Sequence, residues 1–372
     1  MFKLERLKRI DIWLVLLMCI LIGIGTIAIS SATAYSGDTN IVTKQVVFFI
    51  LGFLLMLVVM CIDYHLLGDW YLVIYIATIL VLISVFILGI NRGGAERWIM
   101  IGPMPIQPSE FAKISVALCC GKLIAKYNEK INTIWPIILI GAFEFVPFIL
   151  VNRQPNLSTS IVFIVILVIQ LFVSKLKIKY IMTVALVGFL VMGSLFIYII
   201  KDEDQIILKP YQRQRILDKL NGEDSEKASD QTYKSKQAIG SGGLRGKGLY
   251  QGSISQLNYL PESQNDFIMA VIAEEFGFIG ILIVVLLILL LIVRGLWIAR
   301  AAPDDFGKLI VVGYIGMIAF QSFVNMGVAS DLLPNTGLTI PFISSGGSSL
   351  WANMMGMGLV LSVAASKEDT MF

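Results

Sequence analysis

The chain of 372 residues is too apolar for a water-soluble protein, because 57% of its residues are hydrophobic and only 15% are charged. A soluble domain has about 25% charged residues. The net charge of +3 is too small to indicate a nucleic-acid partner. Composition therefore excludes a soluble enzyme and predicts an all-α polytopic membrane protein, since one span needs only about 20 apolar residues.

Ten apolar segments are candidate transmembrane helices, and we treat residues 1–372 as a single membrane domain. They cover residues 12–33, 44–62, 70–89, 107–125, 134–151, 157–173, 179–200, 265–293, 308–329 and 342–365. A polar stretch at about 202–264 separates the seventh from the eighth segment. We expect it to form a large external loop, whose acidic and Ser-rich middle, 221–231, is typical of a flexible segment.

The positive charges predict the orientation of the spans. Fourteen Lys and Arg residues lie at span ends on the side of the N-terminus, whereas the short loops on the other side carry four. Because positive residues concentrate on the cytoplasmic side, we expect both termini in the cytoplasm and the 202–264 loop outside.

Histidine and cysteine placement limits the chemistry. The one histidine, His65, falls in a short inner loop, so proton transfer at the outer face has to use carboxylates. This excludes Ser-His-Asp hydrolysis and zinc hydrolysis through H-E-x-x-H at that face. The four cysteines lie in or beside apolar runs, which predicts free thiols and no metal cluster.

Charged residues inside the predicted spans are costly and normally face a partner or a cavity. Glu110 and Lys113 are one helical turn apart, which predicts an ion pair on one helix face. Glu144 lies at a similar predicted depth on the next span, so we also considered it a second carboxylate for Lys113.

Two features of the large external loop and its exit each allow a structural and a functional interpretation. Arg245 and Lys247 stand in a stretch with five glycines, 240–248, which is either a plain turn or a contact for an anionic substrate. Asp266 begins the eighth span, where a carboxylate either caps the helix or serves as a general base.

The last outer loop, Leu332–Ser349, is rich in turn formers but too apolar at 338–343 for a simple tether. Irregular backbone at membrane depth is tolerated only where it is buried in protein or lines a cavity. We therefore predict a re-entrant or interfacial segment that lines a cavity.

Several blocks, in order along nearly the whole chain, resemble the shape, elongation, division and sporulation (SEDS) family, which includes RodA and FtsW. The blocks are 97–98 (RW), 107–113 (QPSEFAK), 154–155 (QP), 240–248 (GSGGLRGKG), 256–262 (QLNYLPE), 266–268 (DFI), 274–277 (EEFG) and 341–349 (PFISSGGSS). Two departures are notable. Residues 154–158 read QPNLS where the family usually has QPDLG, and Ser345 stands where the family commonly has Tyr.

The resemblance implies a peptidoglycan glycosyltransferase in a bacterial cytoplasmic membrane. Such an enzyme polymerises glycan strands from lipid II at the outer face and releases undecaprenyl pyrophosphate. Asp266 matches the essential acidic residue of the family and is the expected catalytic base. The residues expected to bind substrate are Arg97, Gln107, Glu110, Lys113, Arg245, Lys247, Pro341 and Ser344.

The resemblance also bears on cofactors and partners. A divalent cation, Mg²⁺ or Mn²⁺, is left open as an aid to the departing pyrophosphate. The expected partners are lipid II, the nascent glycan strand, membrane lipid and a class B penicillin-binding protein. That last protein would crosslink the strands, because no outer segment of this chain carries a Ser-x-x-Lys motif.

Two other functions remain open at this level. A lipid II transporter would use the intramembrane charges as a hydrophilic path, and a scaffold of the cell-wall machinery would need no chemistry. The sequence does not separate a role in elongation from one in division or sporulation.

Overall fold

The computed structural model describes residues 4–34, 40–92, 95–102, 104–180, 228–256 and 263–366, together with 182, 183, 193, 198 and 260. Over these residues the chain is a mostly helical, polytopic membrane fold. Seven of the described helices are long and apolar enough to cross a membrane. Two further helices occupy predicted spans, one with 17 residues and one that carries several charges.

Nine of the ten predicted spans are helices, and the seventh, 179–200, lies almost wholly outside the described residues. The nine are α1 (Ile12–Ala32), α2 (Asn40–Cys61), α4 (Tyr71–Leu88), α5 (Pro108–Lys126), α6 (Ile134–Arg153), α7 (Leu157–Val173), α12 (Ile268–Arg300), α13 (Asp305–Ala329) and α14 (Gly347–Ser366).

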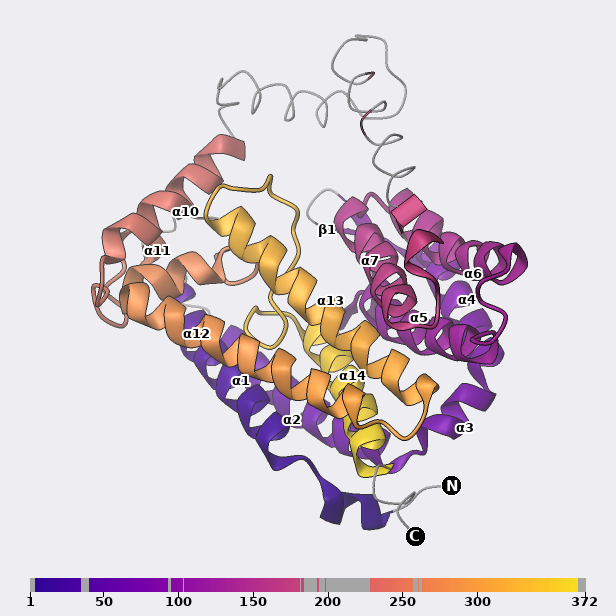
Figure 1. Cartoon of the computed structure of the whole chain (residues 1–372). Helices are drawn as coiled ribbons and strands as arrows, with labels where there is room; N and C mark the ends of the chain where they lie inside the picture. The colour runs from indigo at the N-terminus through magenta and orange to yellow at the C-terminus, as the bar shows by residue number, and fades with distance from the viewer. Residues whose placement is uncertain are drawn as a thin grey trace.

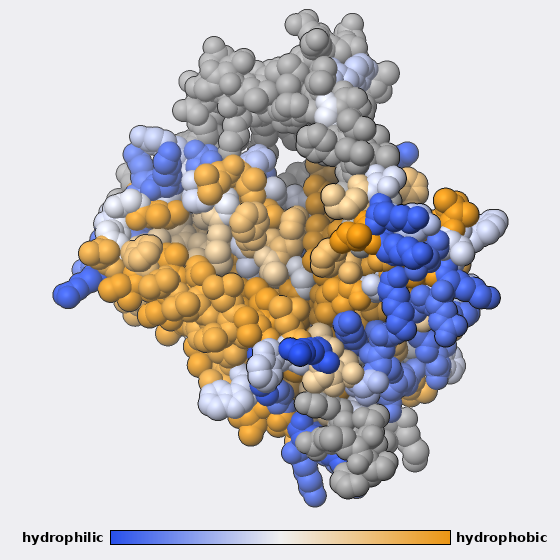
Figure 2. Space-filling model, in the orientation of Figure 1, coloured by the Kyte–Doolittle hydropathy of each residue, from blue (hydrophilic) through white to orange (hydrophobic). Residues whose placement is uncertain are grey.

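Helices α13 and α14 form the centre of the fold, with α1, α2 and α12 on one side and α4 to α7 on the other (Figure 1). Most of α13 and α14 is buried, whereas α4 and α12 expose most of their apolar surface. Small residues permit the close packing, since Gly356 of α14 lies against the Tyr314 ring of α13. The exposed apolar side chains form a broad band in Figure 2, which suits contact with lipid.

Ionic contacts join the two ends of the described chain at one face, near the short helices η1 (Leu4–Arg9) and α3 (Tyr64–Asp69). The buried Arg6 binds Asp63 at 2.9 Å and donates to Ser362 Oγ near the end of α14. Partial burial would raise the pKa of Asp63, but hydrogen bonds from His65 and the Arg6 charge outweigh it and hold that pKa below its ordinary value. We call this the termini face.

A small antiparallel sheet, β1 (Ile90–Arg92), β2 (Ala95–Ile101) and β3 (Met104–Ile106), precedes α5 at the opposite face. No secondary structure was predicted for these residues from the sequence. The pairing of β2 with β1 and with β3 supplies the hydrogen bonds that make the short segment a strand. The sheet leads directly into Gln107, the residue that begins α5.

The predicted external loop is partly helical. Helices α10 (Ala228–Gly242) and α11 (Ser253–Gln256) occupy its last part, so residues 228–231 of the segment expected to be flexible are helical, and 221–227 lie outside the described residues. Ser235 Oγ donates to Ala329 O at the end of α13. Helix α10 therefore lies at the face opposite the termini face.

The segment between α13 and α14 is re-entrant, which is one of the two forms predicted for it, and the predicted cavity lining stays a prediction. Leu338, Ile340, Phe342 and Ile343 are buried. The Ile343 backbone touches α1 at Gly25, where an added Cβ would collide with it. Because Gly25 lies seven residues before the end of α1, the segment reaches about 10 Å into the helix layer.

The contact at Gly25 gives a prediction with a control on the same helix. Gly25→Ala should lower the unfolding temperature in detergent by several degrees, because the methyl group displaces the Ile343 backbone. Gly23 has open space around its Cα, so Gly23→Ala should be neutral or slightly stabilising. Differential scanning fluorimetry measures both, and equal unfolding temperatures for the two variants would contradict the contact.

Candidate active site at the outer end of helix α12

Asp266 lies on the turn 263–267, directly before α12, and is partly buried. Asn325, a buried residue of α13, donates from Nδ2 to the backbone oxygens of Asp266 at 2.9 Å and Leu338 at 2.7 Å. The N-cap position of α12 is Phe267, with no side-chain cap hydrogen bond. Asp266 therefore precedes the N-cap position of α12 by one residue.

The last outer loop fixes the same turn from the other side. Ser344 Oγ donates to Asn265 O at 2.8 Å and accepts from Ile340 N, and Ser345 N donates to Gln264 O at 2.9 Å. Pro341 is buried within this loop. Ser344 thus holds the backbone that precedes Asp266 in place, which is a positioning role.

The Asp266 carboxylate faces this loop at Gly337. An added Cβ at Gly337 would lie 3.8 Å from Asp266 Oδ2, and Gly337 has a φ of +67°, which favours glycine. The backbone of the turn that carries the carboxylate is therefore held by α13 and by the last outer loop, which lie about 60 to 80 residues further along the chain. Rigid placement of this kind is what proton-transfer chemistry requires.

The predicted ion pair on α5 is confirmed. Lys113 Nζ contacts Glu110 Oε1 at 2.9 Å and Oε2 at 3.0 Å, and both side chains are buried. At the start of the same helix, Gln107 N donates to Ser348 Oγ of α14. The last outer loop and the first turn of α14 therefore link the start of α5 to the turn that carries Asp266.

Glu144 does not join that pair. Its Oε2 lies 2.8 Å from Cys120 Sγ, so the structure does not support the proposed cluster with Lys113. The reason is depth, because α6 continues to Arg153, nine residues beyond Glu144. Glu144 consequently meets the middle of α5 instead of its outer end.

Arg97 lies on β2 and is half-buried. Its Nε atom is buried and has no hydrogen-bond partner in the part of the chain that the structure describes. A guanidinium with an unused donor is suited to an anionic ligand.

The glycine-rich stretch 240–248 binds the backbone of α12, which favours the structural interpretation of its glycines. Lys247 N donates to Glu274 O, and Phe278 N donates to Gly243 O. Gly277 has a non-helical conformation inside α12. A Cβ at Gly246 or Gly277 would collide with the backbone of the other segment.

The two basic residues of this stretch, Arg245 and Lys247, lie further from Asp266 along the chain's contact with α12 than the residues of the last outer loop do. Lys247 Nζ pairs at 2.7 Å with Glu274 Oε1, which also accepts from Ile254 N. Arg245 is exposed. The stretch that carries them contacts α12 about two helical turns beyond Asp266. The charge of Lys247 is compensated by Glu274.

Sequence reasoning missed Asn325, which orders both segments around Asp266. The available signal was an amide inside an otherwise apolar span, since such groups are buried only with partners. Its two acceptors come from segments distant in the chain, so the role itself required the structure.

A family model described as a cell cycle protein, named for FtsW, RodA and SpoVE, matches residues 9–369. The stage V sporulation protein E of Bacillus subtilis is 34% identical over 95% of this chain and 96% of its own. The peptidoglycan glycosyltransferase MrdB of Escherichia coli K12 is 36% identical over 95% of this chain and 93% of its own.

Solved structures match over nearly the full length. One, from a study of the structural coordination of polymerization and crosslinking by a peptidoglycan synthase complex, has a TM-score of 0.82 and 28% identity, covering 96% of this chain and 98% of its own. The rod shape determining protein RodA of Thermus thermophilus has a TM-score of 0.71 and 28% identity, covering 96% and 97%.

The buried pair on α5 gives a prediction about stability. Lys113→Met leaves the Glu110 carboxylate buried and unpaired, which should cost about 3–5 kcal/mol. The double variant Glu110→Gln/Lys113→Met should regain most of that loss, because neither remaining side chain is charged. Reversible unfolding in mixed micelles measures the free energies, and a Lys113→Met chain as stable as the wild type would contradict the pair.

Proposed function

Because this chain belongs to the FtsW, RodA and SpoVE family of cell cycle proteins, we propose that it is a peptidoglycan glycosyltransferase that polymerises glycan strands from lipid II. The reaction takes place at the outer face of a bacterial cytoplasmic membrane and releases undecaprenyl pyrophosphate. The observation that carries the proposal is the Asp266 carboxylate, held on a fixed turn between Asn325 and the last outer loop.

Asp266 acts as the general base. Glycosyl transfer forms a bond between the 4-hydroxyl oxygen of the acceptor sugar and the anomeric carbon of the donor, while the bond to pyrophosphate breaks. The hydroxyl proton goes to the Asp266 carboxylate. A carboxylate suits this role when neighbouring backbone fixes its position, as Asn325 and Ser344 do here.

The leaving pyrophosphate needs positive charge near the outer ends of α5 and β2. Arg97 has the better available donor of Arg97 and Lys113, because its Nε has no hydrogen-bond partner among the described residues. Lys113 is paired with Glu110, so it contributes a neutralised and oriented ammonium. Lys247 is paired with the buried Glu274 and suits positioning of α12 better than substrate binding.

A divalent cation remains a proposal. Among the described residues no three His, Cys, Asp or Glu side chains come together as a metal site. Substrate phosphate oxygens are ligands that Mg²⁺ prefers, so the pyrophosphate itself would hold the ion while the Asp266 carboxylate serves as the base. Bound there, Mg²⁺ or Mn²⁺ would supply charge neutralisation for the leaving group.

The placement in the membrane follows from charge and surface. The chain is a multi-pass bacterial membrane protein, and we place the termini face in the cytoplasm because most basic span ends lie there. The apolar band in Figure 2 is the surface that contacts lipid. We place the polyprenyl tails of donor and product in the bilayer beside this band.

The proposed protein partner is a class B penicillin-binding protein. Glycan strands need crosslinking, and no outer segment of this chain has the Ser-x-x-Lys motif of a transpeptidase. The solved relative concerned with a peptidoglycan synthase complex supports such an arrangement.

Polymerisation of labelled lipid II tests the proposal, with the purified chain assayed alone and with its cognate transpeptidase. Asp266→Asn should reduce strand synthesis by about a hundredfold or more, because an amide cannot accept the proton. Asp69→Asn is the control, since that carboxylate is exposed at the termini face. Gel analysis of strand length gives the readout.

The other outcomes are also decisive. If wild type and Asp266→Asn are equally active, the enzyme stands and Asp266 is not its base. If a correctly folded wild type is inactive even with the transpeptidase, the assignment as a glycosyltransferase is wrong. A lipid II transporter or a scaffold then becomes the preferred function.

A further inference from the structure

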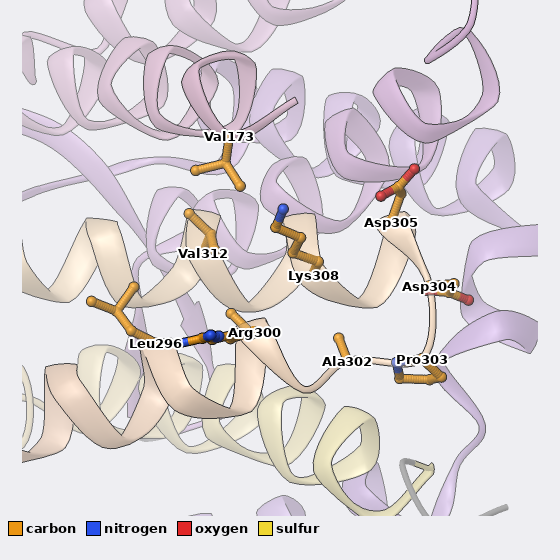
Figure 3. A pocket seen from close by; sticks show the side chains of 10 residues that line it. Val173, Leu296, Arg300, Ala302, Pro303, Asp304, Asp305, Lys308 and Val312 are labelled. Atoms are coloured by element: carbon orange, nitrogen blue, oxygen red, sulfur yellow. The ribbon is translucent and has the colours of Figure 1, made fainter. Parts of the chain in front are cut away.

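A cavity of about 400 Å³ opens at the termini face, where α7, α12 and α13 meet. Its walls come from the end of α7, the last turn of α12, the connection 301–304 and the first turns of α13. Figure 3 shows Lys308 and Val312 on the side of α13 that faces Val173, with Arg300 beside Leu296. The cavity lies at the end of α12 opposite Asp266, so no step of the proposed reaction uses it.

Two cationic side chains, Arg300 and Lys308, line the cavity. Neither Arg300 nor Lys308 forms an ion pair within the described part of the chain, although two aspartates stand nearby. Asp304 is engaged by His65 Nε2 at 2.5 Å and by Gly307 N at 2.6 Å. Asp305 is engaged by Asn128 and Lys175, at 2.5 Å and 3.5 Å.

The aspartates therefore do not neutralise the two cations directly. Figure 3 shows the Asp304 carboxylate directed away from Lys308. Lys175 pairs with Asp305, so the charge of this aspartate is compensated by a residue that does not line the cavity. The cavity thus favours an anionic group.

The remaining wall is apolar and extends into the membrane. Leu296 lies one turn before Arg300 on α12, and Val312 lies one turn beyond Lys308 on α13. Val173 closes the wall from α7. Trp297, which is 68% exposed, stands on the adjoining surface of α12, where an indole ring marks the membrane interface.

We propose that this cavity binds an anionic phospholipid of the inner leaflet. The phosphate lies between Arg300 and Lys308, and an acyl chain follows Val173, Leu296 and Val312. A soluble phosphate would satisfy the cations and leave the apolar wall unused, whereas a phospholipid satisfies both. Basic pockets between membrane helices at the cytoplasmic side bind anionic head groups in this way. The assignment to the inner leaflet rests on the orientation proposed above.

Lipid titration of the full-length chain tests the proposal. The protein in phosphatidylcholine micelles receives phosphatidylglycerol, and native mass spectrometry counts bound lipid while scanning fluorimetry follows the unfolding temperature. We expect one tightly bound phosphatidylglycerol and a rise in unfolding temperature. Arg300→Gln/Lys308→Gln should weaken that binding about tenfold or more, and the charge-retaining Arg300→Lys/Lys308→Arg should bind within about threefold of wild type.

Lys130→Gln is the matched control. Lys130 is exposed on the same face, near Asn132, which donates to Lys175 O, but it does not line the cavity. This variant should bind like the wild type. Strand synthesis in phosphatidylcholine alone verifies that each variant is folded, because neither Arg300 nor Lys308 belongs to the site around Asp266.

Three results would overturn the proposal. Wild-type binding by Arg300→Gln/Lys308→Gln would show that the lipid sits elsewhere. An equal loss in Lys130→Gln would reduce the effect to the net charge of the face. Inorganic phosphate that stabilises the chain as strongly as phosphatidylglycerol would identify a free anion as the ligand. Failure of strand synthesis in every sample, with lipid binding intact, would instead count against the proposed enzyme alone.

Discussion

Backbone polar groups at membrane depth need partners inside the protein, and the arrangement around Asp266 depends on that constraint. The segment between α13 and α14 leaves helical geometry while it dips toward α1. Asn325 and Ser344 supply the hydrogen bonds that its backbone and the neighbouring turn require. The same hydrogen bonds fix the turn that carries Asp266. The groups that satisfy the irregular backbone are therefore also the groups that position the catalytic candidate.

Two of the ion pairs include buried charges of the described spans. Within the described spans, Glu110 and Lys113 neutralise each other near the outer end of α5, and Glu274 binds Lys247 where α12 meets the glycine-rich stretch. These pairs make buried charge tolerable and hold helices to loops. Arg97 has a buried Nε without a hydrogen-bond partner among the described residues, and unlike Arg6 it forms no ion pair there.

Sequence reasoning succeeded where the determining contacts are local. Hydropathy over about 20 residues predicts a span, and spacing along one helix predicts the Glu110–Lys113 pair. It failed where the partner is remote. The strands before α5 and helix α10 need neighbours to complete them. The contact of Glu144 with Cys120 depends on where α6 ends, and the value of Asn325 depends on two acceptors that no local pattern identifies.

The interruption at Gly277 means that α12 is not one rod. Residues 268–276 form a short helical segment of their own, with Asp266 before its first turn. The backbone of the 240–248 stretch is hydrogen-bonded to α12 on both sides of Gly277. Because these bonds join main-chain atoms at close range, the contact leaves no room for a Cβ at Gly246 or Gly277. The direction of the short segment that follows Asp266 is therefore set by its backbone contact with 240–248, separately from the longer part of α12 beyond Gly277.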